Sequence, residues 1–269
     1  MNTAAALRCE GLQLHFGARR VIDGISASFL PGQWTAIVGA NGAGKSTWLS
    51  LLAGLRQADA GAVWLRQRPL AQWPLRERAT RLVWLAQHGS THDTTELAAM
   101  DVVRLARLPH HGLLGAADAA DEAAVGAAMR ETECSDLGAR RLAQLSGGER
   151  QRVLLARALA TADAHDAVWL LDEPTTHLDA PHQRALLRGL RARAQRGATV
   201  ITVLHDLTLA LAADRVLLLE RGRVTADGVP GDAARHAELT QAFGGAWAIH
   251  RLEDEQAGGA TRWVSMPRW

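Results

Sequence analysis

The sequence predicts an α/β fold with a mainly parallel β-sheet. Continuous apolar runs such as WTAIVG (34–39), AVWLLDEP (167–174) and ATVITVLHD (198–206) are typical of strands that are buried on both faces. The first run, after a short glycine-rich loop, and the third run are each followed by a stretch with helical spacing of apolar residues. The length of 269 residues suits one large domain, or a core with an inserted subdomain.

Composition and charge exclude several classes of protein. No window approaches about eighteen uninterrupted apolar residues, and MNTAAALRCEG has neither a basic start nor an apolar core, so we expect no membrane span, no signal peptide and a cytoplasmic protein. Cys9 and Cys134 lie far apart without C-x-x-C spacing, which argues against a disulfide framework or a zinc ribbon. The net charge is only +2 and the basic residues are scattered, so we expect no nucleic-acid partner.

The segment GANGAGKST (39–47) matches the phosphate-loop pattern G-x-x-x-x-G-K-[ST]. It follows the first apolar run and precedes a helical pattern, STWLSLLAGL (46–55), so strand, loop and helix start stand in the required order. In such a loop backbone N–H groups hold the α- and β-phosphates, the lysine reaches the β- and γ-phosphates, and the serine hydroxyl ligates Mg²⁺. The expected fold class is therefore a P-loop NTPase core and the expected cofactors are ATP and Mg²⁺. The residues assigned to nucleotide binding here are Gly39, Asn41, Gly42, Gly44, Lys45, Ser46 and Thr47.

Two carboxylates end the second apolar run. Ligands of open α/β sheets collect at the carboxyl ends of the strands, so we expect Asp172 to hold Mg²⁺ and Glu173 to orient and deprotonate an attacking water. A solvated strand end that caps the next helix is the alternative, and the phosphate loop disfavours it.

Two further strand ends carry polar side chains. The third run ends at His205, which we expect to hydrogen-bond a γ-phosphate; a histidine that caps the following helix is the competing interpretation. The apolar run RLVWLAQH (81–88) ends near Gln87, whose neutral amide is expected to touch the metal or the water.

The segment LSGGERQR (145–152) predicts a second anion site. Ser146 as N-cap with Glu149 three residues later forms a capping box, and Gly147 and Gly148 leave the helix entrance open. A helix N-terminus contributes about 0.3–2 kcal/mol, whereas micromolar affinity needs about 8 kcal/mol. Such a site makes sense if it closes over a phosphate that is bound elsewhere, and a second copy of the chain could supply it head to tail.

GANGAGKST, Gln87, LSGGERQR, VWLLDEP, HLD and His205 occur in an order that closely resembles the nucleotide-binding subunit of ATP-binding-cassette (ABC) transporters, over about residues 5–225. The resemblance implies a homodimer in which the Ser146–Glu149 signature of each copy covers the ATP of the other. It also implies that Asp179 communicates across the dimer and that His205 acts as the switch histidine. Phe16 resembles the aromatic residue that stacks on adenine, but it equally fits a core residue of the first hairpin, so both interpretations stay open.

The resemblance divides the chain into an ABC ATPase domain at 1–225 and a short C-terminal extension at 226–269. Within the domain, 1–86 and 150–225 form the nucleotide-binding core, beginning with an antiparallel β subdomain, and 87–149 form a helical subdomain that carries the signature. Two helices are expected there: TTELAAMDVVRLARL (94–108), starting at a threonine and apolar at Leu97, Met100, Val103 and Leu105, and DAADEAAVGAAMRETE (118–133). The tail beyond Arg221 is expected to be turn-rich.

Histidines and tryptophans are numerous, and neither set predicts a further site. His88, His92, His110 and His111 have irregular spacing and are interpreted as solvated loop residues rather than metal ligands. Trp34, Trp48, Trp64, Trp84 and Trp169 lie inside predicted strands or helices and are interpreted as core residues.

Four functions are compatible with a cassette of this kind. A soluble non-transport ABC ATPase acting on DNA needs long coiled coils or zinc inserts, a ribosome-associated relative joins two cassettes, and a non-hydrolysing regulator would lack Glu173 and His205. We therefore expect the ATP-hydrolysing subunit of a bacterial ABC importer, peripheral on the cytoplasmic face of the inner membrane. Its expected partners are a second copy, a permease that docks near Gln87 and residues 88–110, and, indirectly, a periplasmic binding protein.

The cargo class also follows from resemblance. RLARLPHHG (104–112), EPTTHLD (173–179) and HDLTLALAADRVLLLERGRV (205–224) look most like subunits of ferric siderophore, haem and cobalamin importers. Cobalamin is favoured slightly, and haem is next.

Overall fold

The computed structural model describes residues 4–87, 96–112, 115–162, 165–242, 245, 247–254 and 260–267. Its larger sheet has six strands in the order β10-β9-β3-β8-β7-β6. The five parallel strands are β3 (Trp34–Val38), β6 (Leu82–Leu85), β7 (Val168–Asp172), β8 (Thr199–Val203) and β9 (Arg215–Glu220). The edge strand β10 (Arg223–Gly228) is antiparallel. The prediction of a mainly parallel sheet is confirmed, and all four predicted apolar runs contain strands of it.

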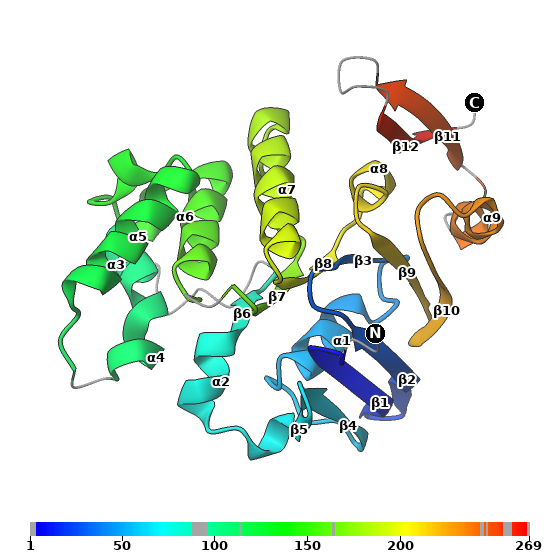
Figure 1. Ribbon diagram of the computed structural model, residues 1–269, viewed down its shortest axis with the longest axis horizontal. Coiled ribbons are helices and arrows are strands. Elements are labelled where there is room, and N and C mark those ends of the chain that lie inside the picture. The colour runs from blue at the N-terminus through cyan, green and yellow to red at the C-terminus, as the bar shows by residue number, and fades with distance from the viewer. Residues whose placement is uncertain are drawn as a thin grey trace.

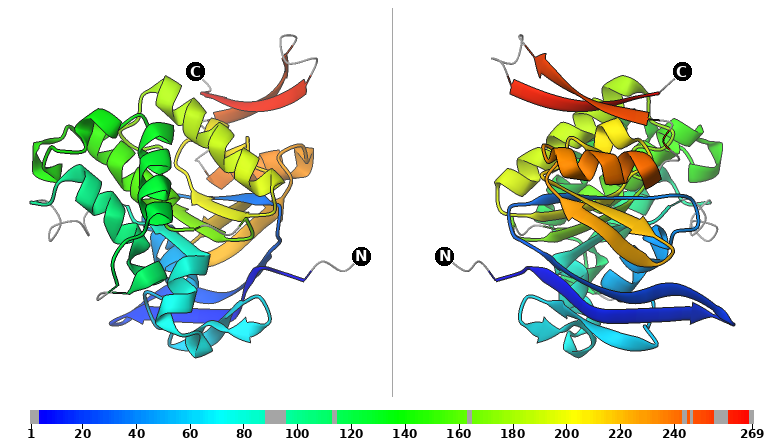
Figure 2. Two further views of the ribbon diagram at one scale, coloured as in Figure 1. Left: turned by 60° about the vertical axis from the view of Figure 1, so that its left-hand side comes forward. Right: turned by 90° about the vertical axis from the view of Figure 1, so that its right-hand side faces the viewer.

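A second, antiparallel sheet has the order β2-β1-β4-β5. Its strands are β1 (Leu7–Phe16), β2 (Arg19–Phe29), β4 (Ala60–Leu65) and β5 (Arg68–Pro69). The first helix, α1 (Lys45–Leu52), lies between this sheet and the central one (Figure 2). Its fully buried Trp48 contacts Phe29 with the ring centroids 6.0 Å apart.

The central strands alternate their side chains between two hydrophobic cores because successive side chains of a strand point to opposite faces. In β7, Trp169 and Leu171 join the core with the helical subdomain, whereas Val168 and Leu170 join the core with α1 and the antiparallel sheet. Both faces of the sheet are therefore covered, which explains why the predicted strands are continuous apolar runs.

The helical subdomain lies beside the central sheet (Figure 1). It contains α3 (Ala99–Arg104), α4 (Leu108–His111), α5 (Ala119–Glu131) and α6 (Gly147–Leu159), and α2 (Leu75–Arg81) precedes β6. The predicted threonine start at 94–95 lies outside the described residues. The structure corrects the predicted apolar face: α3 begins only at Ala99, so Leu97 precedes the helix and is 37% exposed, while Val102 and Val103 are buried.

The chain continues through α7 (Ala180–Gln195) and α8 (Leu207–Ala210) into a folded tail, not the turn-rich one expected. The tail contains β10, α9 (Ala233–Ala242) and a hairpin of β11 (Trp247–Asp254) and β12 (Ala260–Pro267). The hairpin docks on α8 through a hydrogen bond of 2.8 Å between the hydroxyls of Ser265 and Thr208. Such regular structure depends on contacts with the core, which a local pattern does not report.

The expectations about the tryptophans and histidines are partly confirmed. Trp34, Trp48 and Trp169 are buried, and Trp64 and Trp84 are half-buried. His110 and His111 belong to α4 and are half-buried rather than solvated loop residues, whereas His88 and His92 lie outside the described residues.

No group of three or more His, Cys, Asp or Glu that could hold a metal occurs in the described part of the chain. Likewise, none of the described helices is long and apolar enough to span a membrane.

Candidate functional site

The loop between β3 and α1 has a backbone that requires glycine at two positions. Gly39 has φ of 147° and Gly44 has φ of 105°, values that L side chains rarely adopt. A Cβ atom at Gly39 would lie 2.1 Å from the carbonyl oxygen of Leu219, and one at Gly44 would lie 2.8 Å from that of Val21. The loop is therefore packed tightly against β9 and β2, which fixes the start of α1.

Lys45 is the first residue of α1 and is buried. Its Nζ donates to the carbonyl oxygens of Gly39 at 2.7 Å and Ala40 at 3.0 Å, so the ammonium is folded back over the loop. Burial lowers the pKa of Lys45, and the carboxylates of Glu173 and Asp172 act in the opposite direction. A charged ammonium held here is well placed to bind an anion that enters the loop.

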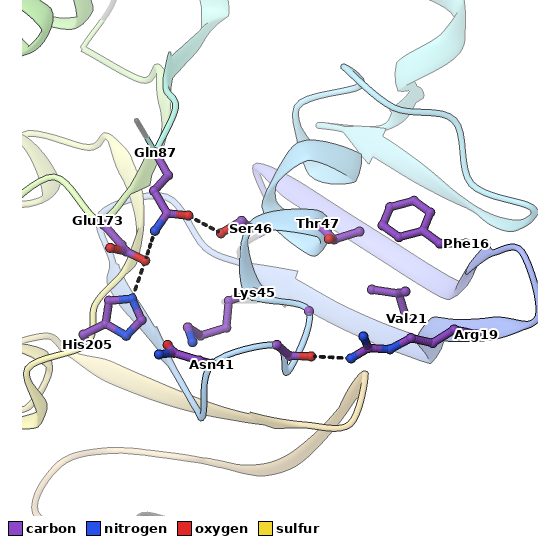
Figure 3. Close-up of a pocket in the computed structure, with 12 residues that line it drawn as sticks. Phe16, Arg19, Val21, Asn41, Lys45, Ser46, Thr47, Gln87, Glu173 and His205 are labelled. Atoms are coloured by element: carbon purple, nitrogen blue, oxygen red, sulfur yellow. Dashed lines mark hydrogen bonds and ion pairs between the residues drawn. The ribbon is translucent and has the colours of Figure 1, made fainter. Parts of the chain in front are cut away.

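A cavity of about 490 Å³ opens in front of this loop (Figure 3). Of the residues assigned from the sequence it is lined by Phe16, Asn41, Gly42, Gly44, Lys45, Ser46, Thr47, Gln87, Glu173 and His205. Arg19 and Val21 also line it and were missed. Arg19 pairs with Phe16 across the β1–β2 turn and donates to the carbonyl of Gly42 at 3.4 Å, so the hairpin turn brings both residues to the loop. The missed residues are Arg19 and Val21, and the register of the β1–β2 hairpin was the signal that could have identified them.

Three strand ends meet at Glu173, as Figure 3 shows. Gln87 Nε2 donates to Glu173 Oε1 at 2.6 Å, and His205 Nε2 makes a short hydrogen bond to the same oxygen. The amide oxygen of Gln87 accepts from the Ser46 hydroxyl at 3.5 Å. Glu173 is buried and has φ of 49°, a strained value for a non-glycine residue. The carboxylate is thus held in one place beside the phosphate loop.

His205 does not cap the following helix. The N-cap of α8 is Asp206, which accepts from the backbone N–H groups of Thr208 and Leu209. The competing interpretation of His205 is therefore wrong for this structure. The carboxylates at the end of β7 are not helix caps either, because Asp179 caps α7.

Asp172 is 3% exposed, and its Oδ1 has no hydrogen-bond partner among the described residues. Burial raises its pKa to about 6, while a hydrogen bond from Ser46 and the charge of Lys45 partly oppose the rise. A buried carboxylate oxygen without a partner is unfavourable unless a cation or a water satisfies it. Together with the Ser46 hydroxyl and the Gln87 amide oxygen, it forms the kind of all-oxygen donor set that Mg²⁺ prefers.

Phe16 is not a core residue of the hairpin, because 47% of its surface is exposed at the cavity wall. The guanidinium of Arg56 lies over its ring, 5.0 Å from the centroid. Of the two interpretations of Phe16, burial in the hairpin core is excluded, and a ring available for stacking remains.

The predicted capping box at the start of α6 is present. Ser146 Oγ accepts from the Glu149 backbone N–H at 3.3 Å, and Glu149 Oε2 accepts from the Ser146 N–H at 2.8 Å. The hydrogen bond from the Ser146 backbone holds the pKa of Glu149 below its usual range. None of Ser146, Gly147, Gly148 and Glu149 lines the cavity of the phosphate loop. Within one chain the two glycine-rich segments therefore do not share that cavity.

Asp179 also lies outside this cavity. Its Oδ1 accepts from the His182 backbone N–H at 3.0 Å and contacts the His182 Nδ1 at 2.5 Å. These hydrogen bonds hold the pKa of Asp179 below its usual range.

A buried phosphate loop facing a carboxylate at the end of a parallel strand defines a P-loop NTPase site. The chain matches the ABC transporter family over residues 22–176, which is more than half of its length. It is 44% identical over 234 residues to "Hemin import ATP-binding protein HmuV" of Streptomyces coelicolor, covering 87% of this chain and 81% of the relative. A protein of the same name from Pseudomonas putida is 43% identical over 241 residues, covering 88% and 92%.

The solved structure of a putative metal-chelate type ABC transporter in an inward-facing conformation has the same fold. Its TM-score is 0.76 at 24% identity, with 98% of both chains covered. The chain belongs to the ABC transporter family. It is an ATPase of this family, in which ATP hydrolysis is coupled to transport.

Proposed function

We propose that two copies of this chain form the motor of a bacterial importer, closing around two ATP molecules to drive uptake through a separate permease. The observation that carries this proposal is the cluster at Glu173. Gln87 and His205 both hydrogen-bond the same carboxylate oxygen of Glu173, Oε1, beside the phosphate loop. A binding module without hydrolysis would not need a carboxylate fixed in this way.

The chemistry follows from the positions of the side chains. The β- and γ-phosphates of ATP offer Lys45 Nζ stronger, charged acceptors than the carbonyls of Gly39 and Ala40. Glu173 orients a water and takes its proton, while the water oxygen bonds to the γ-phosphorus and the bond to the bridging oxygen of ADP breaks. His205, hydrogen-bonded to Glu173, is near enough to contact a γ-phosphate oxygen and so to report whether it is present.

The donor set of Ser46, Gln87 and Asp172 fits Mg²⁺, because it combines a hydroxyl, an amide oxygen and a buried carboxylate oxygen without a partner. The ion would neutralise negative charge on the β- and γ-phosphates. Adenine would stack on the exposed ring of Phe16.

The signature of a second copy supplies the remaining phosphate contacts. Ser146 to Glu149 cap α6 but do not line the cavity of their own chain. A weak anion site of this kind closes over a γ-phosphate already held by Lys45 of the other copy. Asp179 then lies at the contact between the copies and communicates between the two sites.

We propose haem as the cargo, ahead of ferric siderophores and cobalamin. The support is the name of the relatives, "Hemin import ATP-binding protein HmuV", at 44% and 43% identity over most of the chain. Nothing in the comparisons supports the preference for cobalamin drawn from sequence segments. The subunit would lie on the cytoplasmic face of the inner membrane, bound to a permease and only indirectly to a periplasmic binding protein.

Reconstitution in proteoliposomes with the copurified permease tests the cargo and the motor separately. ATP turnover is measured with haem-loaded, cobalamin-loaded and ferric-siderophore-loaded binding protein, with Glu173→Gln as the inactive control. Stimulation by haem alone is expected. Stimulation by another chelate replaces haem as cargo, and turnover without any permease dependence contradicts the importer.

Crosslinking tests the permease surface. Leu97 is 37% exposed at the start of the helical subdomain, and Leu252 is 50% exposed on the C-terminal hairpin. We expect Leu97→Cys to crosslink to the permease and the matched control Leu252→Cys to give no product. The reverse result would move the docking surface to the tail.

A further inference from the structure

The loop that carries Glu173 and Asp179 packs on the start of α6 in the same chain. Gln151 Nε2 donates to the Pro174 carbonyl at 3.0 Å, and both groups are buried. A Cβ atom at Gly148 would lie 2.9 Å from the His177 carbonyl oxygen, so helix and loop are in close contact. A shift of α6 along its axis must therefore move this loop or break these contacts.

His182, on the first turn of α7, joins the same two elements through its side chain. Its Nδ1 lies 2.5 Å from Asp179 Oδ1. Its Nε2 lies 3.4 Å from Arg152 NH1 on α6 and 3.6 Å from Glu133 Oε2, just after α5. Arg152 NH1 also donates to the Glu133 carbonyl at 2.6 Å. One imidazole thus contacts charged groups from three elements.

The hydrogen-bond partner of each His182 ring nitrogen determines whether that nitrogen carries a proton. An ionised carboxylate only accepts hydrogen bonds, so Nδ1 must donate to Asp179. In the neutral ring Nε2 then carries a lone pair and acts as an acceptor. Its partner is the Arg152 guanidinium, which only donates. In the protonated ring Nε2–H faces the Glu133 carboxylate, and the cation at Arg152 is repelled.

We infer that neutral His182 is a positioning residue that ties Asp179 to the signature helix, and that protonation transfers the ring from Arg152 to Glu133. Asp179, Glu133 and Arg152 are the charged groups that the described residues place against the ring. The inference rests on the proposed function, because Asp179 and α6 act on ATP only in the two-copy assembly. It adds a link within one chain between its signature helix and the loop that carries its own Glu173.

One substitution separates the two halves of this link, which are the contact of His182 with Asp179 and its contact with Arg152. His182→Asn places an amide nitrogen near the position of Nδ1, so it keeps a donor for Asp179 and removes the acceptor for Arg152. At about pH 8 we expect kcat for ATP to fall about 5- to 10-fold, the effect of losing one hydrogen bond. ATP binding by the isolated subunit should not change. His250→Asn, on the exposed surface of β11, is the matched control and should match the wild type.

The pH profile distinguishes positioning from a structural role. The neutral and the doubly protonated ring make different contacts, so the link to Arg152 is lost when the ring gains its second proton. The ratio of wild-type to His182→Asn activity should therefore fall toward one as the pH is lowered. A ratio that stays constant with pH overturns the inference. So does a double variant, His182→Asn with Arg152→Gln, whose loss is the product of the two single losses.

A measurement without hydrolysis distinguishes a failure of the inference from a failure of the proposed function. In histidine-labelled protein, the ¹⁵N resonances lost in His182→Asn should identify a neutral ring protonated at Nδ1 near pH 8. An Nε2–H tautomer contradicts the inference whether or not ATP is hydrolysed. Wild-type protein that shows the Nδ1–H tautomer but no turnover with its permease would instead contradict the proposed function.

Discussion

Replacing Asp172 by asparagine should stabilise the nucleotide-free subunit, although the residue is proposed to hold Mg²⁺. Asp172 is 3% exposed, and its Oδ1 has no partner among the described residues. Burial is the main reason why its pKa rises to about 6, and Lys45 and Ser46 offset only part of that effect. Asparagine keeps the shape of the side chain and removes the buried charge.

The magnitude and the sign follow from the two pKa values of Asp172. An aspartate in the unfolded chain titrates near pH 3.9, whereas the folded group titrates at about 6, so the folded state binds its proton more tightly. The contribution of Asp172 to the free energy of unfolding is therefore most favourable below about pH 4, and it is lost as the pH rises to about 6. Above that range the buried charge lowers the free energy of unfolding by about 3 kcal/mol, which is the upper limit for the gain in Asp172→Asn.

Chemical unfolding of the isolated subunit at about pH 4.5 and pH 7.5 measures this difference. Asp172→Asn should be more stable than the wild type at the higher pH, and the gain should shrink at the lower pH. Mg²⁺ with ATP should reverse the order, because only the wild type has the carboxylate for the ion. Asp166→Asn removes an exposed carboxylate that pairs with Arg66 just before β7; this control should show no gain in stability. A variant that is less stable at both pH values would refute the reasoning.

Substitutions at four residues test the nucleotide site. Glu173→Gln should lower turnover by about 10²- to 10⁴-fold and accumulate as a closed dimer with trapped ATP in size-exclusion chromatography, whereas Lys45→Ala should stay open; near-normal turnover would displace Glu173 as the base. Ser146→Arg should leave ATP binding by the isolated subunit intact and abolish cooperative hydrolysis, and an equal loss of both would assign the signature to its own chain. Phe16→Ala should raise KM for ATP about tenfold with kcat unchanged while Phe16→Trp keeps KM, and an unchanged KM in Phe16→Ala would remove the stacking role.

The parts of the site that the sequence predicted best are those whose geometry lies in a few consecutive residues. The phosphate loop depends on glycines at Gly39 and Gly44, and the structure shows backbone oxygens where their side chains would be. Gln87, Glu173 and His205 are far apart in the chain, yet their meeting was predictable because parallel strands end at one edge of the sheet.

The parts that were missed or left open depend on how separate layers pack. Arg19 reaches the loop only because the β1–β2 hairpin stacks over α1, and the exposure of Phe16 depends on the same packing. The tail has regular structure because β10 pairs with β9 and Ser265 hydrogen-bonds Thr208 on α8. Apolar periodicity reports which residues are buried, but it does not report which layer covers them.

In the proposed two-copy assembly, the position of α6 would make a weak anion site useful. Its N-terminal residues do not line the cavity of their own chain, yet Gln151 and Gly148 pack directly on the loop that carries Glu173. If a second copy holds ATP and the γ-phosphate contacts Ser146 of this chain, that contact would therefore bias the position of the loop. A strong site would hold the second nucleotide regardless of the loop, whereas a binding energy of about 0.3–2 kcal/mol is comparable to the few hydrogen bonds that join helix and loop. In that assembly the two energies would match closely enough for each to shift the other, so that hydrolysis at one site would depend on nucleotide at both.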